Sequence, residues 1–185
     1  MGVNSNSFFV NSFPFLGHRQ LFSLVTGCSV AVALTSCNSV TIDQYQATAQ
    51  TTFTWRVRYT IDEATYRNPR FEEFASNSLL NYNGEKPEDA VIGPDDEGLW
   101  WPKMPPKPSI DQVEQREKVQ EIHHKPELLR TVKYHLTYQQ DGQTVTLPTN
   151  YQVYRQVARA YPYGKKLQLT LGINNGSVEK AEPLD

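Results

Sequence analysis

Several stretches of the chain alternate between apolar and polar side chains, which is the pattern of a strand with one buried face. The first covers residues 53–61, FTWRVRYTI, whose polar side includes Arg56 and Arg58. The same alternation recurs over residues 132–138 and over residues 167–173. We therefore predict a strand from each of these three segments.

Turn residues follow two of these segments. The dipeptide DG at positions 141–142 comes just after residues 132–138 and predicts a tight hairpin, with residues 145–147 on the returning strand. The run NNG at positions 174–176 predicts a turn into a short strand at Val178. Both signals favour antiparallel pairing.

Three other segments carry helical or ambiguous patterns. Residues 69–84 space their large apolar side chains as a helix does, with Pro69 in the first turn and a glycine at the end. Ser109 followed by Gln112 forms a capping box and predicts a helix over residues 110–124 with a thin apolar stripe. Residues 150–162 fit either period; we favour a strand there, with a short helix as the alternative.

Residues 85–108 form a different kind of segment. Six of the 12 prolines lie between Pro87 and Pro108, and residues 85–108 also contain six acidic residues. Such a composition predicts an irregular excursion rather than a helix or a strand. We refer to residues 85–108 as the arm.

The arm contains the run GLWWPKMPPKPS, in which aromatic side chains stand beside a polyproline-like stretch. Trp100, Trp101, Pro105 and Pro106 are candidate partner-binding residues, because tryptophans anchor interfaces and such proline segments dock in aromatic grooves. In the alternative interpretation the two tryptophans fold back and cover the sheet. The prolines then only stiffen the loop.

These elements predict an α+β fold with a mainly antiparallel sheet of about four to six strands and one or two peripheral helices. The long proline-rich excursion is part of the same domain, which we place at residues 51–185. The formal charge of −2 and the isoelectric point near 6.1 give no basic surface for phosphate, so we exclude nucleic acid as a partner.

The N-terminal segment is apolar and almost uncharged over residues 21–35, the length of a signal-peptide core and too short for a stable membrane span. It ends in Leu34-Thr35-Ser36-Cys37. This motif resembles the lipobox of bacterial lipoproteins, in which the cysteine thiol receives a diacylglyceryl group and a peptidase cuts just before it.

The resemblance implies a signal peptide over residues 1–36 and a lipid on Cys37 that holds the protein in the membrane. Cys28 fits the motif loosely, but too few apolar residues precede it. Residues 37–50 are polar and small, and we expect them to form a flexible tether. The domain is then expected on the exported side of a bacterial membrane, facing the periplasm or held at the outer membrane; Asn38 mildly favours the outer one.

No catalytic residue, metal site or cofactor is predicted. The chain has no GxSxG, glycine-rich phosphate loop or HExxH motif, and its only two cysteines are Cys28 and Cys37. His123 and His124 are neighbours, whereas a helical zinc pair needs a spacing of four.

Three classes of function follow from these features. The leading hypothesis is a non-enzymatic, lipid-anchored accessory or scaffold protein that binds another envelope protein. The alternative is a module for glycan or cell-wall polymer, with tyrosines on one sheet face as stacking platforms. A hydrolase is the third and least favoured hypothesis.

Overall fold

A computed structural model describes residues 38–61 and 69–184 of the chain. The candidate lipidation site Cys37 and the signal segment lie outside the described residues. All described residues belong to one unit, Ser36–Asp185.

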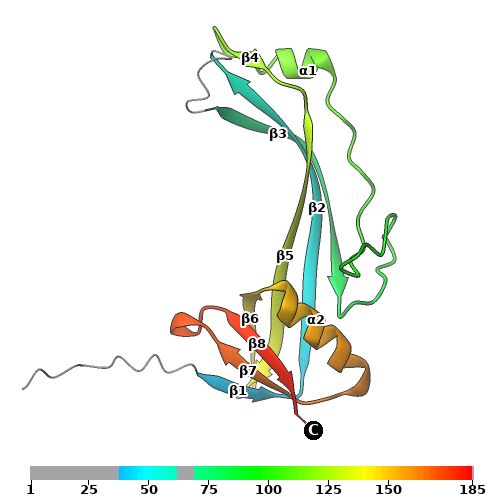
Figure 1. The fold of residues 1–185 in the computed structure, drawn as a ribbon, viewed down its shortest axis with the longest axis vertical. Helices are drawn as coiled ribbons and strands as arrows, with labels where there is room; N and C mark the ends of the chain where they lie inside the picture. Colours follow the sequence, from blue (N-terminus) through cyan, green and yellow to red (C-terminus); the bar gives the residue numbers. More distant parts are fainter. Residues whose placement is uncertain (1–37, 62–68, 185) are drawn as a thin grey trace, which may run out of the picture. The chain divides into compact units, whose positions relative to one another are not determined.

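The described residues form a mainly antiparallel sheet, as the sequence predicts, with eight strands rather than four to six. Its order is β1-β7-β8-β6-β5-β2-β3, with β4 paired to the end of β2 (Figure 1). Only β6 and β8 pair in parallel. The strand bounds are β1 Ser39–Ile42, β2 Tyr45–Thr60, β3 Arg70–Tyr82, β4 Ile122–His123, β5 Glu127–Gln140, β6 Gln143–Thr149, β7 Leu167–Leu171 and β8 Val178–Pro183.

The predicted strands and turns are confirmed, except that the strand predicted over residues 167–173 ends at Leu171, and Ile173 lies in the 3₁₀ turn that follows. β2 contains the alternating segment that starts at Phe53, and β5 contains residues 132–138. Asp141 and Gly142 have φ values of 51° and 76°, as a two-residue hairpin between β5 and β6 requires. β7 and β8 form the last antiparallel pair.

The expected helix over residues 69–84 is wrong, because this segment is strand β3. A β-bulge in β3, where Phe74 and Ala75 together lie opposite Trp55 of β2, shifts the alternation of β3, and the helix-like spacing of three between Phe71 and Phe74 therefore occurs on an extended chain. Serines on β3 bond to threonines across the pair, with Thr52 Oγ1 lying 2.9 Å from Ser78 Oγ. Cross-strand hydroxyl pairs of this kind favour a sheet.

Within the described residues, two short α-helices accompany the sheet. α1 covers only Ile110–Glu114, so the prediction of a helix to residue 124 is wrong beyond the first turns. The capping box at Ser109 is confirmed. The thin apolar stripe buries Val113 alone, and this leaves little to stabilise a longer helix.

α2 covers Tyr151–Ala160, so the preference for a strand is wrong and the alternative is confirmed. Asn150 caps it by accepting the amide of Val153 at 3.0 Å. Four of its side chains lie buried against the sheet at helical spacing: Val153, Tyr154, Val157 and Ala160. Two 3₁₀ turns, η1 Tyr161–Tyr163 and η2 Ile173–Asn175, precede and follow β7.

The expected tether over residues 37–50 is also corrected. Residues 39–42 form β1, and β2 begins at Tyr45. Ile42, Ala47 and Ala49 are buried in the main core. The small side chains of this segment are also typical of a linker, which is why the sequence predicts one. In the structure they allow α2 to pack closely against the sheet.

Two apolar cores lie along the long strand β2. The main core is made by α2 with the strands around it, and includes Leu136 and Leu169. The second core is small and consists of Val57, Tyr59 and Val113, with Phe74 against it. Because β2 has 16 residues, its two ends belong to different clusters.

Candidate functional site

The arm is fixed to the sheet through its main chain. It contains no helix or strand, apart from a bridge between Ile92 and Trp101. The Trp100 amide donates to Asn81 Oδ1 at 2.8 Å, and the Trp100 carbonyl accepts from Asn81 Nδ2 at 3.0 Å. Thr51 Oγ1 also donates to that carbonyl at 2.7 Å. Because Asn81 and Thr51 are fully buried, their polar groups need hydrogen-bond partners inside the protein, and the main chain of the arm provides them.

Trp101 lies in the interior of this contact. Its side chain is 4% exposed, and its ring centroid lies 4.9 Å from that of Phe53 on β2. The Arg130 guanidinium stands 4.9 Å above the same indole ring. The indole N–H donates to Asp95 Oδ2 at 2.7 Å, so its only polar group is paired.

The proline-rich part continues along the sheet. Trp55 Nε1 donates to the carbonyl of Pro105 at 2.9 Å, and Asn77 Nδ2 donates to that of Lys103 at 2.8 Å. Pro105 is buried, whereas Pro106 is exposed. Proline carbonyls can still accept hydrogen bonds, and here the stretch is pinned to β2 and β3 through its carbonyl groups.

The four candidate partner-binding residues thus have unequal surroundings. Trp101 and Pro105 are buried, Trp100 is half-buried with Lys86 Nζ 5.1 Å from its ring, and Pro106 is exposed. The structure does not bring them together on one surface. The alternative interpretation, in which the tryptophans cover the sheet, describes Trp101.

A groove runs between β3 and the arm. It has a volume of about 710 Å³ and is lined by residues 76–80 and Tyr82 on one side and by residues 87–89, 102 and 103 on the other. This volume lies within the range of about 300–1,000 Å³ typical of clefts that hold ligands. We call it the β3 groove.

β3 is the last strand of the sheet, so one side of it is an open edge. Leu80 and Tyr82, both about two-fifths exposed, line the groove at this edge. Sequence patterns did not identify this site, because residues 69–84 were interpreted as a helix. The run SNSLLNY carries little local signal for a strand, since asparagine is depleted in strands, and its distinctive feature is that it has neither charge nor proline.

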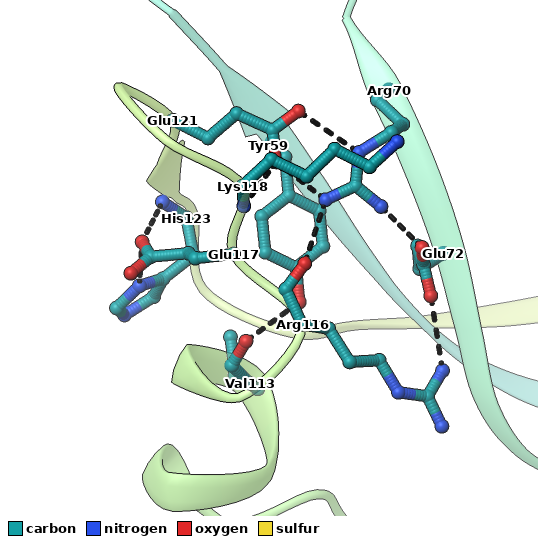
Figure 2. A network of polar contacts seen from close by, with 9 residues as sticks. All are labelled: Tyr59, Arg70, Glu72, Val113, Arg116, Glu117, Lys118, Glu121 and His123. Atoms are coloured by element: carbon teal, nitrogen blue, oxygen red, sulfur yellow. Dashed lines mark hydrogen bonds and ion pairs between the residues drawn. The ribbon is translucent and has the colours of Figure 1, made fainter.

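At the other end of β3, Arg70 is the centre of a polar network, which Figure 2 shows. Its Nε donates to Glu121 Oε1 at 2.9 Å, and another guanidinium nitrogen donates to the main-chain carbonyl of Arg116 at 2.9 Å. Glu72 is a third partner and also accepts from the Arg116 side chain. The Arg70 guanidinium lies 4.3 Å above the Tyr59 ring.

This network changes the acidity of its members. The hydrogen bond from Arg70 holds the pKa of Glu121 well below its ordinary value, at about 2. Burial, and then the charge of Glu72, raises the pKa of the Tyr59 hydroxyl, which donates to the Val113 carbonyl at 2.9 Å. A carboxylate with so low a pKa stays ionised and is unsuited to general-acid chemistry.

The two neighbouring histidines face different partners. His123 Nδ1 lies 2.7 Å from Glu117 Oε1, whereas His124 contacts Arg58 and Thr60 at 3.2 and 3.0 Å. In the described residues, no group of three or more His, Cys, Asp or Glu side chains is arranged to hold a metal ion. The ion pair between Arg70 and Glu121 and the hydrogen bond from Arg70 to the Arg116 carbonyl join the loop after α1 to β3.

The tyrosines do not form one row on the sheet. Tyr134 packs against Tyr151 and Tyr154, with centroid distances of 6.1 and 5.5 Å. The most exposed tyrosines of the described chain lie at the end of β3 and in η1: Tyr82, Tyr161 and Tyr163.

Comparison of the chain with protein-family models, with curated proteins and with solved structures finds no match. Within residues 38–61 and 69–184, none of the helices has the length and apolar character to cross a membrane.

Proposed function

We propose that this protein is a non-enzymatic accessory or scaffold lipoprotein of the bacterial envelope, which binds another envelope protein. The observation that carries the binding part of the proposal is the β3 groove, which combines an open strand edge with a wall made by the arm. The arm contributes by shaping this groove, and its buried Trp101 keeps the wall in place.

The anchoring part of the proposal depends on the motif Leu34-Thr35-Ser36-Cys37. A Cys37→Ser chain expressed in bacteria should lose both the lipid and the processing at that bond, because a hydroxyl is a poor acceptor for the lipid. The matched control is Cys28→Ser, which should stay anchored. Membrane fractionation with mass spectrometry of the N-terminal peptide checks both. Unchanged anchoring of the Cys37→Ser chain would refute the lipid anchor.

The binding part is tested by crosslinking the full chain in intact membranes, followed by mass spectrometry of the attached peptides. We expect crosslinks from the groove residues to one envelope protein. The control is a crosslinker on β6 at the exposed Thr146, which should not capture that protein. Crosslinks that are absent, or that are equal from both positions, would contradict the proposal.

The alternative proposal is a module for glycan or cell-wall polymer. Tyr82 favours it, because an aromatic side chain about two-fifths exposed lines the groove and offers a stacking surface. A panel of envelope glycans, assayed by the thermal midpoint of the full chain and of a Tyr82→Ala variant, decides this alternative. A midpoint that no glycan raises would exclude it.

A further inference from the structure

The hydrogen-bonding direction of β3 is fixed by its pairing with β2. The Asn83 amide donates to the Ala47 carbonyl at 2.9 Å, and the register places Tyr82 opposite Thr48. In an antiparallel pair, residues alternate between those bonded to the partner strand and those whose N–H and C=O point away from it. The odd-numbered residues 77–83 therefore bond to β2, and the even-numbered residues point their main-chain N–H and C=O groups away from β2, toward the open edge.

Three residues present their main-chain groups at this edge: Ser76, Ser78 and Leu80. The edge is closed at both ends, since the Arg116 side chain donates to the Glu73 carbonyl at 2.9 Å and the main-chain amide of Glu85 donates to the Tyr82 carbonyl at 2.9 Å. Between these two points, β2 is the only described strand that pairs with β3. The edge thus offers a row of alternating donors and acceptors.

Soluble proteins protect long edge strands with lysine, proline, bulges or inward charges. Residues 76–82, SNSLLNY, contain no charged residue and no proline. The β2–β3 bulge lies outside them, next to Arg56. An unprotected edge beside a groove is a surface that a second main chain can pair with.

We propose that the β3 groove binds an extended segment of another polypeptide, which adds to the sheet as a strand beside β3. This inference rests on the proposed function, since it specifies how the envelope partner is bound. Main-chain pairing with residues 76–80 provides the affinity. Leu80 and Tyr82 contact side chains of the segment on one face.

The lining of the groove specifies the occupant further. The arm lines one side of the groove at residues 87–89 and 102–103, so an added strand has to fit between the arm and β3, whereas β3 of a second copy would bring its own arm to the same groove. The charged residues that line the groove are Glu88, Asp89 and Lys103, and because the two acidic residues outnumber the one lysine, they favour a segment with a basic side chain. The occupant is therefore an extended, partly apolar peptide with at least one lysine or arginine.

The first experiment places a photo-crosslinking amino acid at Leu80 of the full chain in intact cells. The control position is Thr131, which is exposed on β5, the neighbour of β2 on the side away from β3, and lies opposite Thr52 as Ser78 does. We expect one segment of one other protein to crosslink from Leu80 and not from Thr131. Crosslinking to a second copy of this chain would overturn the inference.

The second experiment uses a synthetic peptide with the sequence of the crosslinked segment, together with the same peptide N-methylated at alternate amides. Strand addition predicts that methylation in one of the two registers weakens binding about tenfold or more, because the edge hydrogen bonds are lost. By NMR hydrogen exchange on the full chain, the Ser78 and Leu80 amides should become protected on binding. Equal binding of all the peptides, with no new protection, would refute strand addition.

Variants of the edge complete the test. Ser78→Pro removes an outward N–H and should weaken peptide binding about tenfold. Ser78→Ala loses the same hydroxyl contact with Thr52 but keeps the N–H, so its binding should match that of the wild type. If Ser78→Pro does not fold, Leu80→Lys, which places a charge at the edge, replaces it.

The outcomes separate the inference from the proposed function. A partner that crosslinks but binds the Ser78→Pro and Leu80→Lys chains as tightly as the wild type would overturn strand addition and leave the accessory function standing. The absence of any crosslinked protein from Leu80 would overturn both.

Discussion

Asp95 Oδ2 accepts the indole N–H of Trp101 at 2.7 Å. The other oxygen of the same carboxylate accepts the main-chain amides of Glu97 and Leu99 at 3.0 and 2.9 Å. One side chain therefore holds a turn of the arm and orients the buried tryptophan. Asp95 therefore adds to the contacts of Asn81, Thr51 and Trp55 that hold the arm to the sheet.

The first prediction concerns this carboxylate. Asp95→Asn replaces one acceptor with an N–H donor, which must face either the indole N–H or the two amides. We expect a loss of about 1–3 kcal/mol in the free energy of unfolding, measured by urea denaturation. The control is Asp96→Asn, an exposed neighbour with unchanged stability expected. Equal midpoints for the two variants would show that the carboxylate does not hold the arm.

The second prediction separates the two adjacent tryptophans. Trp101→Ala leaves a cavity against Phe53 and should cost about 3–5 kcal/mol of unfolding free energy. Trp100→Ala should cost about 1 kcal/mol or less, because the contacts of Trp100 with Asn81 use its main chain, which alanine retains. Thermal denaturation of both variants checks this. A larger loss for Trp100→Ala would contradict the arrangement.

The third prediction concerns Arg70. Arg70→Lys keeps the charge but loses the planar group that bonds Glu121 and stacks on Tyr59, so we expect a loss of about 1–3 kcal/mol in unfolding free energy. The matched control is Lys180→Ala, which breaks an exposed ion pair with Glu182 and should cost at most about 0.5 kcal/mol. Urea denaturation compares them. Equal losses would mean that the Arg70 network stabilises the fold no more than an exposed ion pair does.

The fourth prediction is a pH dependence. The pKa of Glu121 is lowered from 4.5 to about 2 by its bond with Arg70, so the folded state favours the ionised carboxylate. Its contribution to stability is fully present above pH 4.5 and is lost as the pH falls toward 2.

Glu121→Gln removes this titration. Between pH 5 and pH 2 its urea midpoint should fall less steeply than that of the wild type, whereas above pH 5 the two curves should run parallel. The exposed Glu114→Gln variant, which has no ion pair in the described structure, should follow the wild-type curve throughout. An acid profile of Glu121→Gln identical to the wild type would refute the coupling.

The strands can be predicted from the sequence where one face of the sheet is buried and the other is exposed to solvent. The strands through Phe53 and Leu169 and the hairpin at Asp141 carry that alternation and a matching turn residue. β1 and the start of β2 were missed because their buried residues include small ones such as Ala47, whose burial depends on the approach of α2. The packing of α2 against these strands is a tertiary contact, and local sequence composition does not encode it.

The candidate site was less predictable, because its contacts join distant parts of the chain. Arg70 and Glu121 are 51 residues apart, and no spacing rule relates them. The tryptophan pair was recognised as chemically distinctive. Which of the two is buried depends on Asn81 and Thr51, which lie on strands that hold the arm by its main chain.

The pattern of residues 150–162 fits the period of a strand as well as that of a helix, and the chain forms the helix α2 there. The N-terminal cap of α2 provides the last prediction. Asn150 accepts the Val153 amide at 3.0 Å and so satisfies one of the unpaired donors at the helix start. Asn150→Ala should cost about 1 kcal/mol of unfolding free energy, and Asn150→Asp, which keeps the accepting oxygen, should recover most of it. Urea denaturation measures both. A loss for Asn150→Asp as large as for Asn150→Ala would instead assign the effect to the second contact of Asn150, in which Nδ2 donates to the Glu179 carbonyl at 3.3 Å.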